Sequence, residues 1–520
     1  MFLKKKKEKN LIKANEPLLE NEVVKKIEKK PFIIEKKHYI MFGIFFSVFC
    51  LFLCLGCFGG DDYWWHVKVG EWIVQNKQIP KTGIFSWYAQ ENNLSWFAHE
   101  WLAEVILYGF TCLFGPNGGV VYLILCIILV SALLYCFNYK GYMKNMAFSC
   151  ILQMGLFFAL AFICTARPHM LTISFFTILV YNCRKIKEDE NYNKYLFFPL
   201  LTIFWANYHG GSTNLTYIVP LIFFFTSLFN FKYGKVESIR IKKGYRYLIL
   251  AIMNIFAIMV NPRTYELLYY PYSYTSEYSK YINEWKSPNM SGAPFIFILI
   301  IVICLIFFTT TKNINFSELV IIGAFMLLTL KSVRFEIWLF IVTTMFIFKY
   351  IRELNDKSVY KFLSYEFVII GIGLFFYSIY SFATGTSYIS KGVSDEAMEV
   401  IKNTEYEHLM NYYDYGSYLI YEDVEVFIDG RADMYVDTNF FDEAKSTIYT
   451  YDYLPSDFLE DYDCDLFLLP SKCIFSWYLE CHPEEYELIY KGDEETDFCK
   501  IFKKIDKNSN NNTMTTTSRN

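Results

Sequence analysis

The chain has little charge for its length. Of its 520 residues only 20% are charged, and the formal net charge is −4, whereas soluble domains carry about 25% charged residues. A chain this close to neutrality is not a globally basic nucleic-acid binder. Hydrophobic residues make up 54% of the sequence and are gathered into runs too long for soluble core helices. These features exclude a water-soluble enzyme, a disordered chain, a collagen-like repeat and a disulfide scaffold.

Common catalytic motifs are also missing. The sequence has no P-loop, no dinucleotide-binding fingerprint, no nucleophile elbow and no HExxH pattern of a zinc enzyme. Most of its 14 cysteines lie in or beside apolar runs, where cysteine is a small apolar filler. Cys464, Cys473, Cys481 and Cys499 lie outside these runs. Their spacing is not a zinc pattern, and the sequence leaves open whether they form a disulfide.

The apolar residues form about eleven runs that predict transmembrane helices. Residues 1–37 are polar and lysine-rich, as expected for a cytoplasmic tail. The first run covers about 39–58, which is too long for a signal peptide and predicts an uncleaved span. The other runs lie at about 117–137, 146–164, 169–182, 195–208, 213–231, 245–261, 293–310, 316–331, 335–350 and 365–384. The predicted fold is an all-α polytopic membrane domain over residues 38–384, with about 11 transmembrane helices.

The distribution of Lys and Arg favours one orientation of this domain. With the tail inside, the inner loops carry most of the basic residues, as the positive-inside rule requires. This holds only if the segment Trp101–Phe114 does not cross the membrane, so we expect it to be a surface helix within a first outer loop, residues 59–116. An odd number of spans then places the C-terminus outside. The sequence thus predicts a multi-pass cell-membrane protein with a cytoplasmic N-terminus and an extracytoplasmic C-terminal domain.

Residues 385–505 have no apolar run and predict a small acidic α/β domain. Strand patterns lie at Gly416–Tyr421, Val424–Ile428, Asp465–Leu469, Glu487–Tyr490 and Phe498–Phe502. Helical patterns lie at Ser394–Lys402, Phe440–Ile448 and Ser456–Asp461. Within the domain, Asp429, Arg431 and Asp433 are expected to form an ion-pair cluster that fixes a turn. Residues 506–520, rich in Asn and Thr, are expected to be disordered.

Two adjacent carboxylates, Asp61 and Asp62, follow the first predicted span. Ionised carboxylates at a membrane boundary are costly unless they are paired, solvated or bound to a metal. One interpretation is that they only end the span. The other is catalytic: one of them takes a proton from an acceptor hydroxyl, or their oxygens hold a divalent cation such as Mg²⁺ or Mn²⁺.

Other polar residues on the predicted outer face are candidates for substrate binding. Arg167, Arg263 and Arg334 are expected at the outer ends of three spans. A guanidinium can bind two phosphate oxygens, so converging arginines would suit a lipid phosphate; the alternative is snorkelling to lipid headgroups. The remaining candidates are His66, His99, Glu100, His169 and His209. These side chains could bind substrate or act as acids and bases, or they could serve only in interfacial packing and hydrogen bonding.

Several motifs resemble a widespread group of bacterial multi-pass membrane proteins. They are Asp62-Tyr63-Trp64-Trp65-His66, Gly70-Glu71-Trp72-Ile73, His99-Glu100-Trp101, Ala166-Arg167-Pro168, Trp205-Ala206-Asn207, His209-Gly210-Gly211, Asn261-Pro262, Glu284-Trp285 and Asp429-Gly430-Arg431-Ala432-Asp433. The resemblance covers most of residues 39–500. The group looks like a branch of the GT-C glycosyltransferase superfamily, which includes protein mannosyltransferases and oligosaccharyltransferases. This resemblance implies many spans, a first outer loop with a surface helix, and a donor sugar carried on a polyprenyl phosphate or pyrophosphate.

The resemblance predicts a membrane glycosyltransferase, a hexosyltransferase acting on the outer face. It would move a sugar from a polyprenyl-phosphate-linked donor to a glycan, lipid or protein acceptor. Asp61 or Asp62 would be the base, and the arginines would stabilise the departing lipid phosphate. Two alternatives stay open. One is a transporter or flippase of lipid-linked glycans, against which the scarcity of ionisable residues in the spans argues. The other is a non-enzymatic envelope assembly protein, which divergence of the carboxylates and arginines would favour. Membrane lipids are expected partners; nucleic acid is not.

Overall fold

The computed structural model describes part of the chain. The described residues are 62–138, 155–156, 159–160, 163–189, 191–239, 241–273, 283–350, 391–435, 440–449, 453–493 and 499–506. All of them belong to one of the two compact units of the chain, Ile44–Asn520. The predictions for Asp61, the basic tail, the first and last apolar runs and the disordered tail lie outside the described residues.

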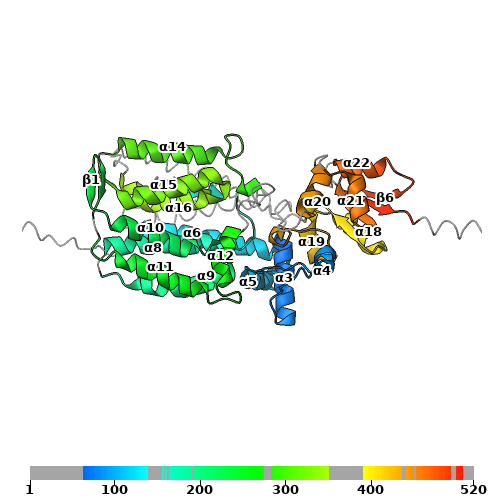
Figure 1. The fold of residues 1–520 in the computed structure, drawn as a ribbon, viewed down its shortest axis with the longest axis horizontal. Helices are drawn as coiled ribbons and strands as arrows, with labels where there is room; N and C mark the ends of the chain where they lie inside the picture. Colours follow the sequence, from blue (N-terminus) through cyan, green and yellow to red (C-terminus); the bar gives the residue numbers. More distant parts are fainter. Residues whose placement is uncertain are drawn as a thin grey trace, which may run out of the picture. The chain divides into compact units, whose positions relative to one another are not determined.

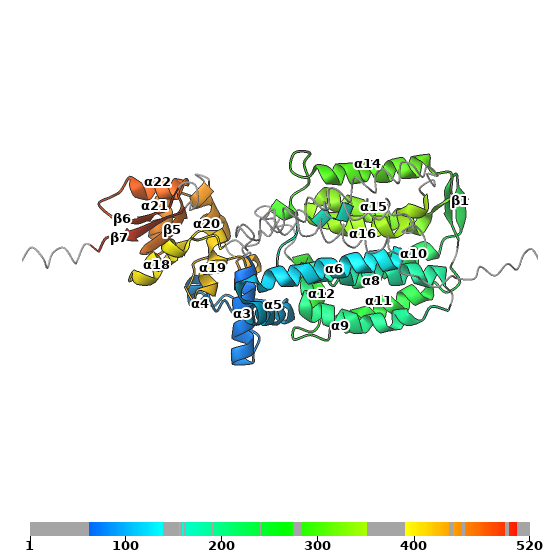
Figure 2. The ribbon, with the colours of Figure 1, turned by 180° about the vertical axis from the view of Figure 1, so that it is seen from behind.

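Helices dominate the described residues up to residue 350 (Figures 1 and 2). They are α3 (Asp62–Asn76), α4 (Trp87–Glu91), α5 (Trp101–Phe114), α6 (Gly118–Asn138), α8 (His169–Glu188), α9 (Phe198–Tyr208), α10 (Leu215–Ser227), α11 (Tyr245–Ile258), α12 (Glu266–Ser273), α14 (Pro294–Thr309), α15 (Phe316–Lys331) and α16 (Glu336–Phe346). Helices α6, α8, α10, α15 and α16 pack side by side, and α9 and α11 pack beside α8 and α10. Eight of the predicted apolar runs, from 117–137 to 335–350, each overlap one of these helices, and α8 continues beyond its run to Glu188.

One described helical segment, Trp101–Phe137, is long and apolar enough to cross a membrane by itself. The apolar helices Tyr245–Ile258 and Pro294–Thr309 are shorter than a spanning helix, so the figure of about eleven spans stays a prediction. Large apolar side chains are exposed on several helices, among them Phe204, Phe256 and Ile298. Exposed apolar surface of this kind is typical of contact with a membrane or a partner protein.

The long apolar segment consists of two helices. Helix α5 ends at Phe114, and a 3₁₀ turn, η1 (Gly115–Asn117), separates it from α6. Gly115 has φ +65°, a conformation that glycine adopts without steric cost. Helix α5 packs against α3, and Gly70 of α3 lies so close to the backbone of α5 that an added Cβ would collide with it. A turn therefore separates Trp101–Phe114 from α6, and the prediction that Trp101–Phe114 lies on the membrane surface stays a prediction.

The C-terminal described residues form a four-stranded sheet with helices. The strands are β4 (Leu409–Asn411), β5 (Leu466–Pro470), β6 (Tyr486–Lys491) and β7 (Cys499–Lys504), in the order β4-β5-β7-β6. Strand β4 pairs with β5 in parallel, and β7 is antiparallel to both its neighbours. The helices are α18 (Asp395–Asn403), α19 (Gly416–Tyr421), α20 (Phe440–Tyr449), α21 (Pro455–Asp461) and α22 (Ile474–Glu480). A small α/β region is therefore present, as the sequence predicted.

Several details of this region differ from the prediction. The segment Gly416–Tyr421 is helix α19, not a strand. Its residues 416–420 are all buried, so they show no strand alternation, and Ser417 accepts a hydrogen bond from the backbone of α3. Val424–Ile428 is not a strand; it forms a single β-bridge, between Val426 and Ser86. Strand β4 and helix α22 were not predicted.

Two further findings concern the rest of the chain. A small sheet of β1 (Phe231–Tyr233), β2 (Val236–Ser238) and β3 (Ile314–Asn315) joins the segment after α10 to the start of α15. It is an exception to the predicted all-α membrane domain. Cys464, Cys473 and Cys481 are free thiols in the C-terminal region.

Candidate active site

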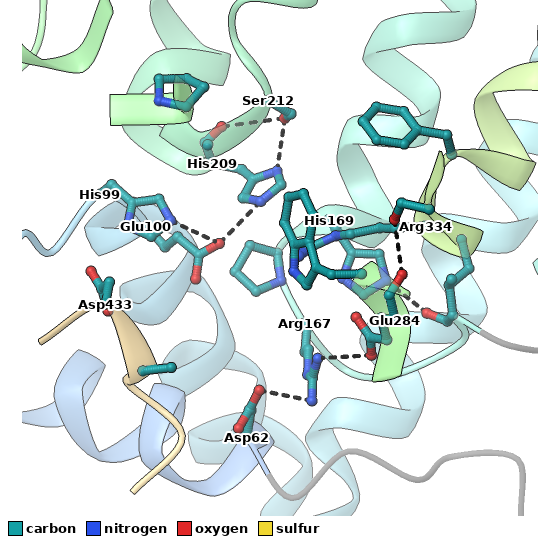
Figure 3. Close-up of a pocket in the computed structure, with 18 of the residues that line it drawn as sticks. Asp62, His99, Glu100, Arg167, His169, His209, Ser212, Glu284, Arg334 and Asp433 are labelled. Atoms are coloured by element: carbon teal, nitrogen blue, oxygen red, sulfur yellow. Dashed lines mark hydrogen bonds and ion pairs between the residues drawn. The ribbon is translucent and has the colours of Figure 1, made fainter. Parts of the chain in front are cut away.

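A cavity of about 1960 Å³ brings together most of the residues that the sequence singled out (Figure 3). Its polar lining includes Asp62, His66, His99, Glu100, Arg167, His169, His209, Glu284, Arg334 and Asp433. These residues come from α3, the loop before α5, the segment leading into α8, the turn after α9, the segments before α14 and α16, and the turn at residues 429–433. Eight of the ten predicted site residues thus line one cavity although they are far apart in the sequence.

Arg263 is the exception among the described candidates, and its role in substrate binding stays a prediction. It does not line the cavity. Its guanidinium pairs with Glu266 at 3.6 Å, donates to the Trp96 carbonyl at 2.9 Å and lies over the ring of Phe97. These contacts hold the side chain against the loop before α5.

Arg167 lies between two carboxylates. Its Nη2 is 2.8 Å from Asp62 Oδ2, and its Nη1 is 3.3 Å from Glu284 Oε1 (Figure 3). Burial raises the pKa of Asp62, and the Arg167 guanidinium opposes that rise. Because protein carboxylates already balance its charge, Arg167 is less suited than an unpaired cation to bind a phosphate.

Glu100 is surrounded by imidazoles instead of cations. Its Oε1 is 3.1 Å from His209 Nε2 and 3.6 Å from His99 Nε2, and its Oε2 is 3.7 Å from His66 Nε2. Burial lowers the pKa of all three histidines, that of His99 to about 4, so the rings are neutral at pH 7. Burial also raises the pKa of Glu100 to about 8, against the opposing effect of Arg334. A carboxyl with such a pKa can exchange protons near neutral pH.

The orientation of His209 is set by its own neighbours. Trp205 Nε1 donates to Ser212 Oγ at 2.9 Å, and Ser212 Oγ lies 2.9 Å from His209 Nδ1. Since Ser212 accepts from Trp205, its hydroxyl can donate to Nδ1, which places the proton of His209 on Nε2, facing Glu100. The backbone of Gly210 also donates to the His99 carbonyl at 3.1 Å. This turn therefore holds the Glu100 loop and the histidine together.

Arg334 is a cation of the cavity lining that a phosphate could bind. It lies in the 3₁₀ turn η5 (Val333–Phe335), directly before α16, and its guanidinium stacks 5.0 Å from the ring of Trp285. Within the part of the chain that the structure describes, it forms no ion pair. Ser332 and Val333 hydrogen-bond to the backbone of Glu284 and Lys286, which fixes the turn. Lys331, at the end of α15, adds a second cation to the lining.

The C-terminal region supplies one wall of the cavity. Asp429 and Arg431 are buried and joined by hydrogen bonds at 2.7 and 2.8 Å, so the predicted ion pair exists. Gly430 sits directly on Asp62, where an added Cβ would collide with the carboxylate. Asp433 faces the cavity and accepts a hydrogen bond from Tyr270 at 3.1 Å. Burial raises the pKa of Asp433 to about 6. The sequence pattern indicated an ion-pair cluster that includes Asp433, and Asp433 was not among the predicted site residues.

Part of the cavity is apolar. Its lining there comes from α8, α10, α15 and α16, through Ile173, Ile218, Ile222, Phe325, Leu328 and Trp338. Ile218 and Ile222 are one turn apart on α10, so this part of the lining runs along the helix for about 6 Å. This lining could not be predicted from the sequence, because its residues do not differ in type from lipid-facing residues of the same apolar runs.

The structure does not test whether the protein binds a divalent cation. Among the described residues, no group of three or more His, Cys, Asp or Glu is arranged to hold a metal. Asp61 lies outside the described residues, and Asp62 is paired with Arg167. The proposed Mg²⁺ or Mn²⁺ site therefore stays a prediction.

A scan of protein-family models and a search of curated proteins find no match to the chain. Among solved structures, it is similar to the apo oligosaccharyltransferase of Archaeoglobus fulgidus, with 10% identity and a TM-score of 0.48 over 84% of this chain and 70% of that one. A second structure of that enzyme, tethered to an acceptor peptide with an NVT sequon, has 11% identity and a TM-score of 0.46 over 84% and 70%. A third, the archaeal oligosaccharyltransferase AglB from the same organism with an inhibitory peptide and a dolichol-phosphate, has 11% identity and a TM-score of 0.46 over 86% and 70%.

Proposed function

We propose that the protein is a membrane glycosyltransferase that moves a sugar from a polyprenyl-phosphate-linked donor to an acceptor hydroxyl in the cavity. The observation that carries this proposal is the mixed lining of one cavity. Carboxyls and cations, mostly from helix ends and connecting segments, line it together with apolar side chains from within four helices. A polyprenyl-phosphate sugar likewise has an apolar chain and a polar head.

The phosphate of the donor would bind at Arg334 and Lys331. A guanidinium can make two charge-assisted hydrogen bonds to phosphate oxygens. The N-terminal end of α16, which begins two residues after Arg334, adds backbone N–H groups and a favourable dipole. The polyprenyl chain would then lie against Ile218, Ile222 and the other apolar residues of the lining.

Glu100 is the base that the geometry favours. In the proposed reaction, the acceptor oxygen attacks the anomeric carbon and gives its proton to Glu100. The new bond joins the acceptor oxygen to the anomeric carbon, and the bond from that carbon to the phosphate oxygen breaks with inversion. Arg334 and Lys331 stabilise the charge that develops on the departing polyprenyl phosphate. Asp62, which the sequence proposed as base, is already engaged by Arg167.

The C-terminal region would complete the acceptor side. Asp433 lies on the cavity wall near Glu100, and its carboxyl could accept hydrogen bonds from acceptor hydroxyls. No specific observation favours the transporter or the assembly protein. Asp62, Arg167 and Arg334 line one cavity, which argues against an assembly protein, whereas Arg263 lies outside that cavity.

Donor binding gives the first test. Arg334→Gln should weaken binding of a polyprenyl phosphate by about 10–100-fold, the usual effect of losing a hydrogen bond to a charged group. Titration of the purified protein in detergent, followed by the fluorescence of cavity residues Trp285 and Trp338, would measure this. Arg263→Gln is the matched control, because Arg263 lies outside the cavity. Equal affinity in both variants and the wild type would rule out Arg334 as a phosphate ligand.

The apolar lining gives a second test. Ile222→Trp should fill part of the lining and raise the KM for long-chain donors about tenfold, while donors with a short prenyl chain are affected less. Leu327→Trp is the control, because Leu327 is 71% exposed on the outer side of α15. Comparing KM for donors of two chain lengths separates a blocked chain from a general loss of stability. An equal effect on both donors would show that the polyprenyl chain of the donor does not bind against Ile222.

A further inference from the structure

Glu104 is a buried acid that the proposed reaction does not use. It lies on α5, one turn after Glu100, and is fully buried on the cavity wall. Neither of its carboxyl oxygens makes a hydrogen bond to a described residue. A buried polar group without a partner is costly, and an ionised carboxylate is the costliest case. Glu104 is therefore expected to be neutral, with a proton to donate.

The imidazole of His66 lies between Glu104 and Glu100. Its Nδ1 is 3.7 Å from Glu104 Oε1, and its Nε2 is 3.7 Å from Glu100 Oε2. Nδ1 is buried and makes no hydrogen bond to a described residue. The ring of Trp65 covers that of His66, with centroids 3.7 Å apart. Two buried polar atoms without partners lie side by side here, and a hydrogen bond between them would satisfy both.

We propose that Glu104, as a neutral acid, is a positioning residue for Glu100. When the 3.7 Å gap closes to hydrogen-bond length, the O–H of Glu104 donates to His66 Nδ1 and fixes the proton of His66 on Nε2, facing Glu100. His209 faces Glu100 with its own Nε2–H, held by Ser212. Two N–H donors then favour the ionised, basic form of Glu100. This inference rests on the proposed role of Glu100 as base.

Other groups also affect the ionisation of Glu100. The charged or titratable groups that act on it are His66, His99, His209, Asp62, Asp433, Arg167 and Arg334. Glu104 is close to Glu100 as well, and if it were ionised its charge would oppose ionisation of Glu100. A neutral Glu104 and an ionised Glu104 therefore predict different shifts in the pKa of Glu100 when Glu104 is replaced.

The test compares Glu104→Gln with Glu104→Leu. The amide of glutamine can still donate to His66 Nδ1, so the pH profile of kcat/KM for sugar transfer should stay as in the wild type. Leucine cannot donate, so Glu100 would lose the N–H donor of His66 and its pKa would rise. The acidic limb of the profile should therefore shift to higher pH by about one unit. A purely structural role would lower the rate at every pH without moving the limb. A limb that moves down in Glu104→Gln would show that Glu104 is ionised, and either result overturns the proposal.

A second measurement does not depend on transferase activity or on the leucine variant. Infrared spectroscopy of the purified full-length protein should show the carbonyl band of a protonated carboxyl at pH 9. That band should be absent in Glu104→Gln and present in Asp433→Asn. If Glu104→Gln leaves the wild-type spectrum unchanged, the proposal fails even where sugar transfer is demonstrated. If the band disappears only in Glu104→Gln but the protein transfers no sugar from polyprenyl-phosphate donors, the proposed function fails instead.

Discussion

Replacing Glu100 with glutamine should reduce sugar transfer by about 10²–10⁴-fold, the range typical of losing a general base. Glutamine has nearly the same shape, but it cannot take the proton from the acceptor hydroxyl. Since the neighbours of Glu100 are neutral imidazoles and not a paired cation, the change leaves no ion pair broken in the core. The variant should therefore fold and bind the donor, and kcat should fall much more than donor affinity.

The pH dependence of the wild type follows from the same residue. Burial raises the pKa of Glu100 to about 8, and only the ionised carboxylate can act as base. Transfer measured as kcat/KM should thus rise with pH up to about 8 and level off above it. This limb should disappear in Glu100→Gln. A rate that is already constant from about pH 6 would contradict the assignment of the base.

Two further variants decide whether Glu100 or Asp62 is the base. Glu425→Gln is the control for the substitution, because Glu425 is exposed on the C-terminal region, away from the cavity lining. Asp62→Asn should reduce the rate less than Glu100→Gln, through the altered ion pair with Arg167. If Asp62→Asn abolishes transfer while Glu100→Gln retains it, the base is the residue that the sequence alone favoured.

Replacing Asp429 with alanine should destabilise the C-terminal region by about 3–5 kcal/mol, the usual effect of breaking one side of a buried ion pair. Asp429 is fully buried and accepts hydrogen bonds from the Arg431 guanidinium at 2.7 and 2.8 Å and from Tyr435 at 2.9 Å. Without it, the Arg431 charge would be buried and unpaired. Denaturant unfolding of the full-length protein in detergent, followed by circular dichroism, would measure the loss.

Asp395→Ala is the matched control for that prediction. Asp395 also pairs with a cation, Lys391, at 2.7 Å, but its side chain is 75% exposed. Exposed pairs contribute about 0–1 kcal/mol, so this variant should unfold nearly as the wild type does. Similar losses in both variants would show that the Asp429 pair does not hold the turn. Donor turnover should also fall in Asp429→Ala, since the same turn carries Asp433 and covers Asp62.

The sequence predicted most of the helical runs and which polar residues gather around one cavity, for a physical reason. A charged residue in a chain of apolar helices is placed at a helix end or in a polar cavity, so Asp62, Arg167 and Arg334 were expected near one another. Their pairing could not be predicted, because it depends on which helices pack together. Arg167 binds Asp62 and Glu284, whereas Arg263 turns away onto Phe97.

Other features needed the packed structure. Tyr418, Ile420 and Tyr421 have high strand propensity, yet residues 416–420 are buried, and the segment packs against α3 as helix α19. Glu104 looked like one polar position on a surface helix, and only its burial beside His66 sets it apart. The apolar lining of the cavity is made of residues such as Ile222 and Leu328, which the sequence does not distinguish from lipid-facing ones.

The proposed transfer of sugar from a lipid-linked donor is tested most directly in cells that lack this protein. Polyprenyl-linked sugars and envelope glycans would be extracted and compared between these cells and cells given back the wild type or Glu100→Gln. The account predicts that one glycan is lost and its polyprenyl-linked sugar accumulates, and that the wild type reverses both changes whereas Glu100→Gln does not. Unchanged glycans and unchanged lipid-linked sugars, under conditions in which the protein is made, would contradict it.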